Sequence, residues 1–298
     1  MGRLAQTLGP TGTLPSLNSE MKTMAITETV LEMHYHKPML DLIRSTYGIG
    51  KTGHFNFYKY SPQKEVFLGF DQAYAMTQYT DEEFFDLLKN SALTSNYKLP
   101  SKFVAYFLQY KVVTELSKRQ AKTPTSIKSK PHYRVTLDTT KNDRTGFSQH
   151  ELLHSLSSND GAMVYYACPM LFDKAELYEP DPTLDALQLV DMMSCPGSFG
   201  DNSKHYIYFD QKTAQPVWCS EPIAGKSITA IQFSERVLQR IYESDTVQGG
   251  ESIRAMLAAA KERRAETVIQ SDGERNGLSL VSDSLTIIEF VPAPKGGA

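Results

Sequence analysis

A long apolar, strand-like run that ends in polar residues is the feature that most limits how this chain can fold. Residues 103–111 read FVAYFLQYK. Aromatic and aliphatic residues fill the run, as they do in a buried strand. Gln109 and Lys111 stand two positions apart at its end, and residues i and i+2 of a strand share a face. Buried polar groups need hydrogen bonds, a metal or a substrate, so we predict a site at the end of this strand.

A second strand-like run also ends in a polar residue. Residues 65–71 read EVFLGFD and place Asp71 at the edge of the run. The preceding residues 54–60, HFNFYKY, are rich in aromatic side chains, and SPQK separates the two segments. This pattern predicts a β-hairpin. Asp71 therefore joins Gln109 and Lys111 as a candidate site residue.

The composition predicts a folded protein with little overall charge. The chain has 298 residues, of which 41% are hydrophobic and 22% charged, and its net charge is −3. This is enough for one large domain or two smaller ones. A nucleic-acid partner therefore needs a local basic patch. One Pro/Ser/Thr-rich segment, expected to be an exposed loop, supplies Lys118, Arg119, Lys122, Lys128, Lys130 and Arg134.

The cysteines and the hydropathy pattern predict a cytoplasmic protein. Cys168, Cys195 and Cys219 form no close pairs, which is typical of free thiols in a reducing compartment. A zinc site built from Cys195, His205 and Cys219 lacks the usual ligand spacing. No apolar run approaches the roughly 20 residues that span a bilayer, so no membrane partner is expected. Residues 1–24 lack an apolar, signal-like core and are expected to form a flexible extension.

Helix and strand signals predict a mixed α/β or α+β domain with a helical C-terminal extension. Thr27 is the expected N-cap of a first helix that ends before Pro38, and a second helix follows. The domain expected over residues 25–232 is followed by a helical region, 233–298, with a final strand. The other expected elements are strands over 132–137, 162–170, 205–210 and 285–291, and helices over 80–90, 148–156, 234–244 and 251–266.

Other catalytic patterns are incomplete in this sequence. Gly50-Lys51-Thr52 resembles the end of a phosphate-binding loop, but Ser45 stands where the first glycine belongs and a helical stretch precedes it. The sequence has no G-x-S-x-G elbow and no recognisable cysteine-hydrolase signature. Four histidines in helical pairs are expected to be packed or surface residues rather than metal ligands. They are His34, His36, His150 and His154.

The polar strand ends together resemble the PD-(D/E)xK nuclease superfamily. The family pattern has an acid on the second core strand and a (D/E/Q)-x-K tripeptide on the third, and an acid on the first helix often joins them. GFD at 69–71 matches the first element, QYK at 109–111 matches the glutamine-bearing form of the second, and Glu32 or Glu28 matches the helix acid. The resemblance covers residues 25–170, about half of the chain. It implies a restriction-endonuclease-like mixed sheet flanked by helices.

This resemblance implies metal-dependent hydrolysis of phosphodiester bonds, with DNA as the expected substrate and defence against phage DNA as the expected role. Mg²⁺ or Mn²⁺ is expected to be held by Asp71, Gln109 and Glu32, because hard cations prefer oxygen ligands. Lys111 is expected to position the attacking water or to stabilise the developing charge. The residues expected to contact the nucleic-acid backbone are Lys102, Lys118, Arg119, Lys122, Lys128 and Lys130.

Gln109 also supports an alternative. An amide in place of the usual acid removes one negative charge from the metal site, and the long interval between Asp71 and Gln109 departs from compact family members. A non-catalytic subunit of a larger complex or homo-oligomer, with a degenerate nuclease fold that binds a protein or nucleic acid, has the same strand pattern. Distances discriminate between the two, because an enzyme needs Asp71, Gln109 and Lys111 around one metal-sized pocket.

Overall fold

The computed structural model describes most of the middle of the chain. The described residues are 26–48, 55–59, 72–94, 101–141, 148–158, 162–172, 174–177, 183–199, 204–219, 222–243 and 285–290. Asp71, the extension expected over 1–24, the phosphate-loop-like Gly50-Lys51-Thr52 and the helix expected over 251–266 lie outside them.

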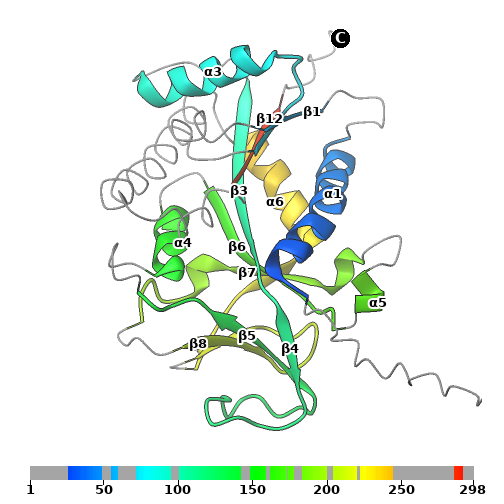
Figure 1. Cartoon of the computed structure of the whole chain (residues 1–298), viewed down its shortest axis with the longest axis vertical. Helices are drawn as coiled ribbons and strands as arrows, with labels where there is room; N and C mark the ends of the chain where they lie inside the picture. The colour runs from blue at the N-terminus through cyan, green and yellow to red at the C-terminus, as the bar shows by residue number, and fades with distance from the viewer. Residues whose placement is uncertain are drawn as a thin grey trace, which may run out of the picture.

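A seven-stranded mixed sheet forms the centre of the molecule (Figure 1). β3 runs parallel to β6, β12 runs parallel to β2, and the other neighbours are antiparallel. The expected mixed α/β architecture, with a mixed sheet flanked by helices, is therefore confirmed. The strands across the sheet are β1 (Asn56–Lys59), β2 (Gln72–Ala75), β12 (Leu285–Phe290), β3 (Lys102–Tyr110), β6 (Ala162–Pro169), β7 (Leu187–Asp191) and β11 (Ser227–Thr229).

The last strand of the chain is a central strand of this sheet. β12 lies between β2 and β3 and pairs with both. Its alternating side chains enter the two hydrophobic layers, Ile287 on one face and Ile288 on the other, and both are fully buried. The C-terminal region therefore contributes to the main sheet and is not an extension that begins at residue 233.

Helix α1 (Glu28–Tyr47) is continuous, although Pro38 lies inside it. The break predicted at this proline is wrong. Thr27 accepts a hydrogen bond from the Val30 backbone at 3.3 Å, and Gly48 adopts the left-handed conformation with φ 77° that ends the helix. A proline inside a helix costs about 3 kcal/mol. The buried side chains on both sides of Pro38 offset that cost by packing on the sheet, and they are Leu31, Tyr35, Met39, Leu40 and Ile43.

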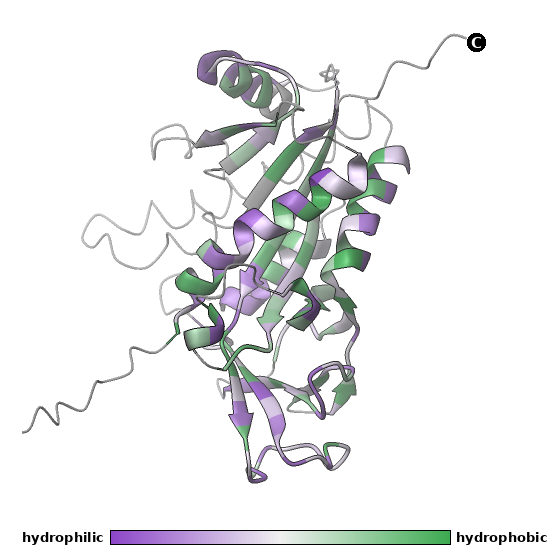
Figure 2. Cartoon of the chain, turned by 90° about the vertical axis from the view of Figure 1, so that its right-hand side faces the viewer, coloured by the Kyte–Doolittle hydropathy of each residue, from purple (hydrophilic) through white to green (hydrophobic). Residues whose placement is uncertain are grey.

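Helices cover both faces of the sheet. The even-numbered residues of β3 from Val104 to Tyr110 pack with α1 and with α6 (Ala230–Glu243), which also contact each other. The odd-numbered residues from Phe103 to Phe107 pack with α3 (Asp81–Leu93) and α4 (Gln149–Ser158). Hydrophobic and hydrophilic residues alternate along α1, as expected of a helix with one buried face (Figure 2).

A capping box begins α3, the helix expected over residues 80–90. The Thr80 hydroxyl accepts from the Glu83 backbone at 3.2 Å, and the Glu83 carboxylate accepts from the Thr80 backbone at 2.8 Å. Short helical turns connect other elements, and they are α5 (Lys174–Leu177), η1 (Leu184–Ala186) and η2 (Met192–Ser194). In the described part of the chain, no helix combines the length and hydrophobicity that crossing a bilayer requires.

A smaller antiparallel sheet follows the end of β3. One of its faces joins the main core through Val135, Ile207 and Trp218. In Figure 1 it lies below the large sheet, where the chain runs from β3 directly into β4. Its strands in order are β10 (Ile223–Ala224), β9 (Val217–Cys219), β8 (His205–Phe209), β5 (His132–Leu137) and β4 (Val113–Leu116).

Candidate functional site

Four polar side chains from three elements meet at the end of β3, and we call them the β3-end cluster. Gln109 and Lys111 come from β3 and the residue after its end, Glu28 from the first turn of α1, and Gln149 from the first turn of α4. The Lys111 side chain is 5% exposed, whereas that of Glu28 is 41% exposed. The cluster therefore has a buried cation and a carboxylate that solvent can reach.

Lys111 holds the cluster together. Its Nζ donates to Glu28 Oε1 at 2.9 Å and Oε2 at 3.2 Å, and to Gln149 Oε1 at 3.2 Å. Its backbone N–H donates to Ala167 at 2.9 Å, so the pairing of β3 with β6 continues one residue beyond the strand. This anchored backbone fixes where the side chain begins, and the three oxygen atoms to which Nζ donates lie on the neighbouring helices.

Gln109 closes the ring of hydrogen bonds. Its Nε2 donates to Glu28 Oε2 at 3.4 Å, and its Oε1 accepts from Gln149 Nε2 at 3.4 Å. Gln109 and Lys111 thus contact the same two helix residues, consistent with their spacing of two in the strand. Rotation of the Gln109 side-chain amide by half a turn would exchange the positions of its oxygen and nitrogen. The amide oxygen would then face the Glu28 side of the cluster and be available as a ligand.

The helix acid in this cluster is Glu28. Glu32, the residue favoured from the sequence, lies one turn further along α1 and beside Tyr110. Burial raises the pKa of Tyr110 well above its ordinary value, and the nearby Tyr106 and Glu32 raise it further. Asp71 immediately precedes the first residue of β2 and lies outside the described residues. β12 separates β2 from β3, because Thr286 pairs with Gln72 on one side and Tyr106 on the other.

Gln149 is the member of the cluster that sequence reasoning missed as a site residue. Its only signal is its position at the start of the helix expected over 148–156, next to the predicted N-cap Ser148. α4 connects β5 to β6, and β6 pairs with β3. The first turn of α4 therefore lies beside the end of β3.

Two of the residues predicted to contact nucleic acid form hydrogen bonds within the chain. Lys102 lies at the opposite end of β3, where its Nζ donates to the carbonyl oxygens of Ile241 at 2.7 Å and Tyr242 at 3.3 Å at the end of α6. Arg119 donates to the carbonyl oxygens of Thr123 at 3.1 Å and Pro124 at 2.9 Å, and to that of Ile127.

The β4–β5 loop keeps the other predicted cations on its surface. Lys118, Lys122, Lys128 and Lys130 are exposed. The loop is fixed by Asp210, whose Oδ1 accepts from the Lys128 and Ser129 backbones at 2.6 and 2.7 Å. These backbone N–H groups lower the pKa of Asp210. The lysine side chains of this loop are therefore exposed, whereas hydrogen bonds to Asp210 hold its backbone in place.

His150 is a packed histidine. It is fully buried, and its Nε2 lies 2.8 Å from the carbonyl oxygen of Pro196 while its Nδ1 lies 2.9 Å from the Tyr166 hydroxyl. Because a carbonyl only accepts, Nε2 carries the proton and Nδ1 accepts from Tyr166. Burial lowers the pKa of His150 to about 4. Both ring nitrogens are therefore used within the core.

Cys195 and His150 lie close together in the core, and no third metal-ligating side chain joins them among the described residues. Cys195 Sγ lies 3.6 Å from His150 Nε2, and burial raises the pKa of the Cys195 and Cys168 thiols far above the ordinary value. His205 stacks on Phe199, with ring centres 3.9 Å apart. Within the described ranges, no group of three or more His, Cys, Asp or Glu side chains is arranged to hold a metal. A thiolate nucleophile is also disfavoured at these buried sites.

The buried state of His150 predicts a loss of stability in acid. The pKa of His150 is about 4 in the folded protein, below its ordinary value of 6.5. Between these two pH values the unfolded chain therefore binds a proton more readily than the folded chain does. The stabilisation from neutral His150 is complete above about pH 6.5 and is lost as the pH falls toward about 4. Over this range the free energy of unfolding should fall by roughly 3 kcal/mol. Chemical denaturation at about pH 7, 5.5 and 4 measures it. His150→Gln should remove this part of the pH dependence and His154→Gln should keep it; an unchanged profile in His150→Gln contradicts the assignment.

No protein-family model matches this chain, and neither a curated protein nor a solved structure is significantly similar to it. The function is therefore inferred from the chemistry of the site.

Proposed function

We propose that this chain is a Mg²⁺- or Mn²⁺-dependent nuclease of restriction-endonuclease-like fold that acts on DNA. The observation that carries the proposal is the convergence of Glu28, Gln109 and Lys111 at the end of one central strand, with Lys111 Nζ 2.9 Å from the Glu28 carboxylate. The (D/E/Q)-x-K tripeptide and the acid on the first helix are two of the three elements of the superfamily pattern, and Asp71 is the expected third.

The order of the elements supports the proposal. The chain provides a helix with the acid (α1), a pair of antiparallel strands (β1 and β2), a strand with the QYK tripeptide (β3), and then a core helix and a parallel strand (α4 and β6). This is the order in which the family carries its motifs. The inserted β12 is a departure, because it leaves β2 two strand spacings, roughly 10 Å, from β3.

The donor set fits a hard divalent cation. Glu28 supplies an exposed carboxylate and Gln109 an amide oxygen after rotation of its side chain, and Mg²⁺ accepts such oxygen ligands while keeping several waters. Asp71, next to β2, is the expected second acid. When bound, the metal would polarise the phosphodiester and lower the pKa of a bound water. Lys111, held by Glu28 and Gln149, is placed to orient the attacking water or to stabilise charge on the phosphate.

The small sheet has the charge expected of a nucleic-acid surface. Its described residues, 112–139, 204–219 and 222–224, include eight Lys and Arg but three Asp and Glu, while the whole chain has a net charge of −3. On this sheet Arg134 Cζ lies 4.8 Å and Lys122 Nζ 5.9 Å from the centre of the Tyr206 ring. Clustered cations beside an aromatic ring suit contacts with phosphates and bases.

A non-catalytic DNA-binding subunit is the second candidate. The observation that favours it is the closed hydrogen-bonding of the β3-end cluster, in which Lys111 neutralises Glu28 and the Gln109 amide nitrogen faces the carboxylate. Such a protein binds DNA through the small sheet but does not cleave it with any divalent metal. The two candidates therefore differ in cleavage and not in binding.

A matched pair of substitutions on α1 tests the proposed metal site. Glu28→Gln removes the carboxylate of the cluster, whereas Glu32→Gln removes the same charge one turn away. We expect Glu28→Gln to lower the rate of metal-dependent DNA cleavage about 10²-fold or more and Glu32→Gln to leave it within about threefold. Initial rates on labelled DNA at saturating Mn²⁺ measure this. Equal losses in the two variants, or a loss only in Glu32→Gln, would overturn the role of Glu28.

A further inference from the structure

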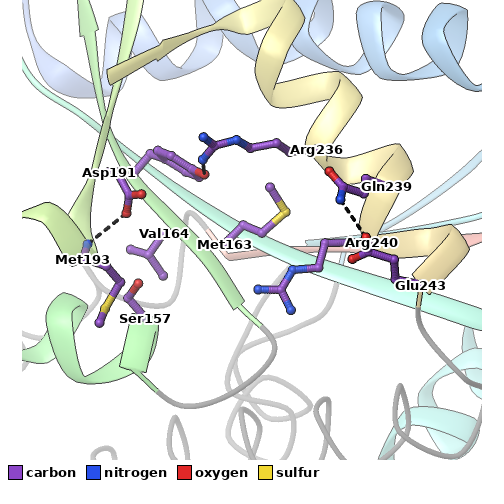
Figure 3. A pocket seen from close by; sticks show the side chains of 10 residues that line it. Ser157, Met163, Val164, Asp191, Met193, Arg236, Gln239, Arg240 and Glu243 are labelled. Atoms are coloured by element: carbon purple, nitrogen blue, oxygen red, sulfur yellow. Dashed lines mark hydrogen bonds between the residues drawn. The ribbon is translucent and has the colours of Figure 1, made fainter. Parts of the chain in front are cut away.

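A pocket of about 310 Å³ lies between α6, the start of β6 and the η2 turn. Figure 3 shows residues of α6 on one side of it and those of β6 and of the η2 turn on the other. No member of the β3-end cluster lines it. Its lining residues are Ser157, Met163, Val164, Tyr165, Asp191, Met193, Arg236, Gln239, Arg240 and Glu243.

The pocket lies where the start of β6 extends beyond the end of its antiparallel neighbour β7. The pairing of the two strands ends with Tyr165 opposite Asp191, and the chain then turns into η2 (Met192–Ser194). Val164 and Met163 therefore extend past the end of their neighbour. α6 crosses this part of the sheet and turns the side chains of its last two turns toward the gap (Figure 3).

The side chains that line the pocket provide more hydrogen-bond donors than the described residues around them accept. Asp191 accepts from the Met193 backbone at 2.9 Å, and Glu243 accepts from Gln239 Nε2 at 2.6 Å, so both carboxylates have partners. Arg236 gives one N–H to the Tyr165 hydroxyl at 3.0 Å. Among the described residues, none accepts a hydrogen bond from Arg240. Each guanidinium has five N–H groups, so most of these donors have no acceptor among the described residues.

We propose that this pocket binds a small molecule that carries a phosphate or carboxylate group on an apolar body. Arg236 and Arg240 lie one helical turn apart on α6, and an arginine fork matches the geometry of both oxyanions. The side chains of Met163, Val164 and Met193 provide the apolar surface for the rest of the ligand. The volume lies at the lower end of the usual range for small-ligand pockets. This binding does not depend on the proposed nuclease activity.

Binding of simple anions to the full chain tests the pocket. Phenyl phosphate, benzoate and inorganic phosphate are titrated by calorimetry in a chloride buffer, with benzyl alcohol as the uncharged probe. We expect at least one of the two aromatic anions to bind more tightly than inorganic phosphate and than benzyl alcohol. Stronger binding of phenyl phosphate assigns the ligand to phosphate compounds, and stronger binding of benzoate assigns it to carboxylates.

Variants then place the ligand in this pocket. Arg240→Ala should weaken binding of the tighter-binding anion at least tenfold. Arg240→Lys should weaken it by less, because lysine keeps the positive charge but lacks the forked N–H groups of the guanidinium. Lys118→Ala, which removes a positive charge on the small sheet, should not change binding. Absence of anion binding, equal binding of benzyl alcohol, or equal affinity in Arg240→Ala overturns the proposal. DNA cleavage by Arg240→Ala should match the wild type, so a failure here is separate from a failure of the nuclease proposal.

Discussion

Replacement of Lys111 by alanine is expected to reduce metal-dependent DNA cleavage by about 10²–10⁴-fold. Lys111 is the cation at the centre of the β3-end cluster, and it contacts Glu28 and Gln149 directly. Single-turnover rates with labelled DNA and Mn²⁺ measure the effect on the chemical step. Binding of the same DNA, measured by fluorescence anisotropy in EDTA, should remain within about threefold, because the basic surface lies on the small sheet.

The Lys111→Ala protein should still fold. The carboxylate that loses its partner, Glu28, is 41% exposed, so water can solvate its charge. Lys141→Ala is the matched control, because Lys141 also pairs with a glutamate, Glu151, at 3.7 Å. It should cleave DNA as the wild type does. Equal cleavage by Lys111→Ala and wild type contradicts the catalytic role.

Replacement of Glu289 by alanine is expected to lower the free energy of unfolding by about 3–5 kcal/mol. Glu289 is fully buried on β12. Its carboxylate accepts from the Thr77 backbone at 3.0 Å, from the Tyr79 hydroxyl at 2.8 Å, and from the Ser101 hydroxyl. Alanine leaves these donors without an acceptor. Since they come from segments on both sides of β12, the loss should loosen the insertion of this strand between β2 and β3.

Guanidinium denaturation followed by the fluorescence of Trp218 measures this loss. Trp218 is the single tryptophan of the chain and is 1% exposed. Glu289→Gln keeps an acceptor oxygen and should cost less than alanine. Glu115→Ala, at an exposed position of β4, should stay within about 0.5 kcal/mol of the wild type. A cost below about 1 kcal/mol for Glu289→Ala contradicts the role given to this carboxylate.

Local signals in the sequence predicted much of the fold. The apolar run that ends at Tyr110, the capping residues Thr80 and Glu83, and the expected strand over 132–137 all lie in elements of the expected kind. The position of β12 could not be predicted, because pairing of residues 285–290 with β2 and β3 is a long-range choice that local patterns do not encode. The continuity of α1 through Pro38 also depends on packing against the sheet.

The site could be predicted in part. The spacing of Gln109 and Lys111 indicated a shared environment, because it follows from strand geometry alone. Glu28 and Glu32 are four residues apart and lie on the same side of α1, so only the placement of the helix on the sheet separates them. Gln149 reaches the cluster through the connection from β5 to β6, and this depends on the tertiary arrangement of α4.

Cleavage of DNA by the wild-type protein is the most direct test of the central claim, that the β3-end cluster is a metal-dependent nuclease site. The purified full chain is incubated with labelled single- and double-stranded DNA, and in parallel with RNA, in Mg²⁺, in Mn²⁺ and in EDTA. We expect cleavage of DNA that requires the divalent metal and is absent from the Lys111→Ala protein prepared in the same way. DNA binding without cleavage in either metal, or cleavage that Lys111→Ala retains, would contradict it.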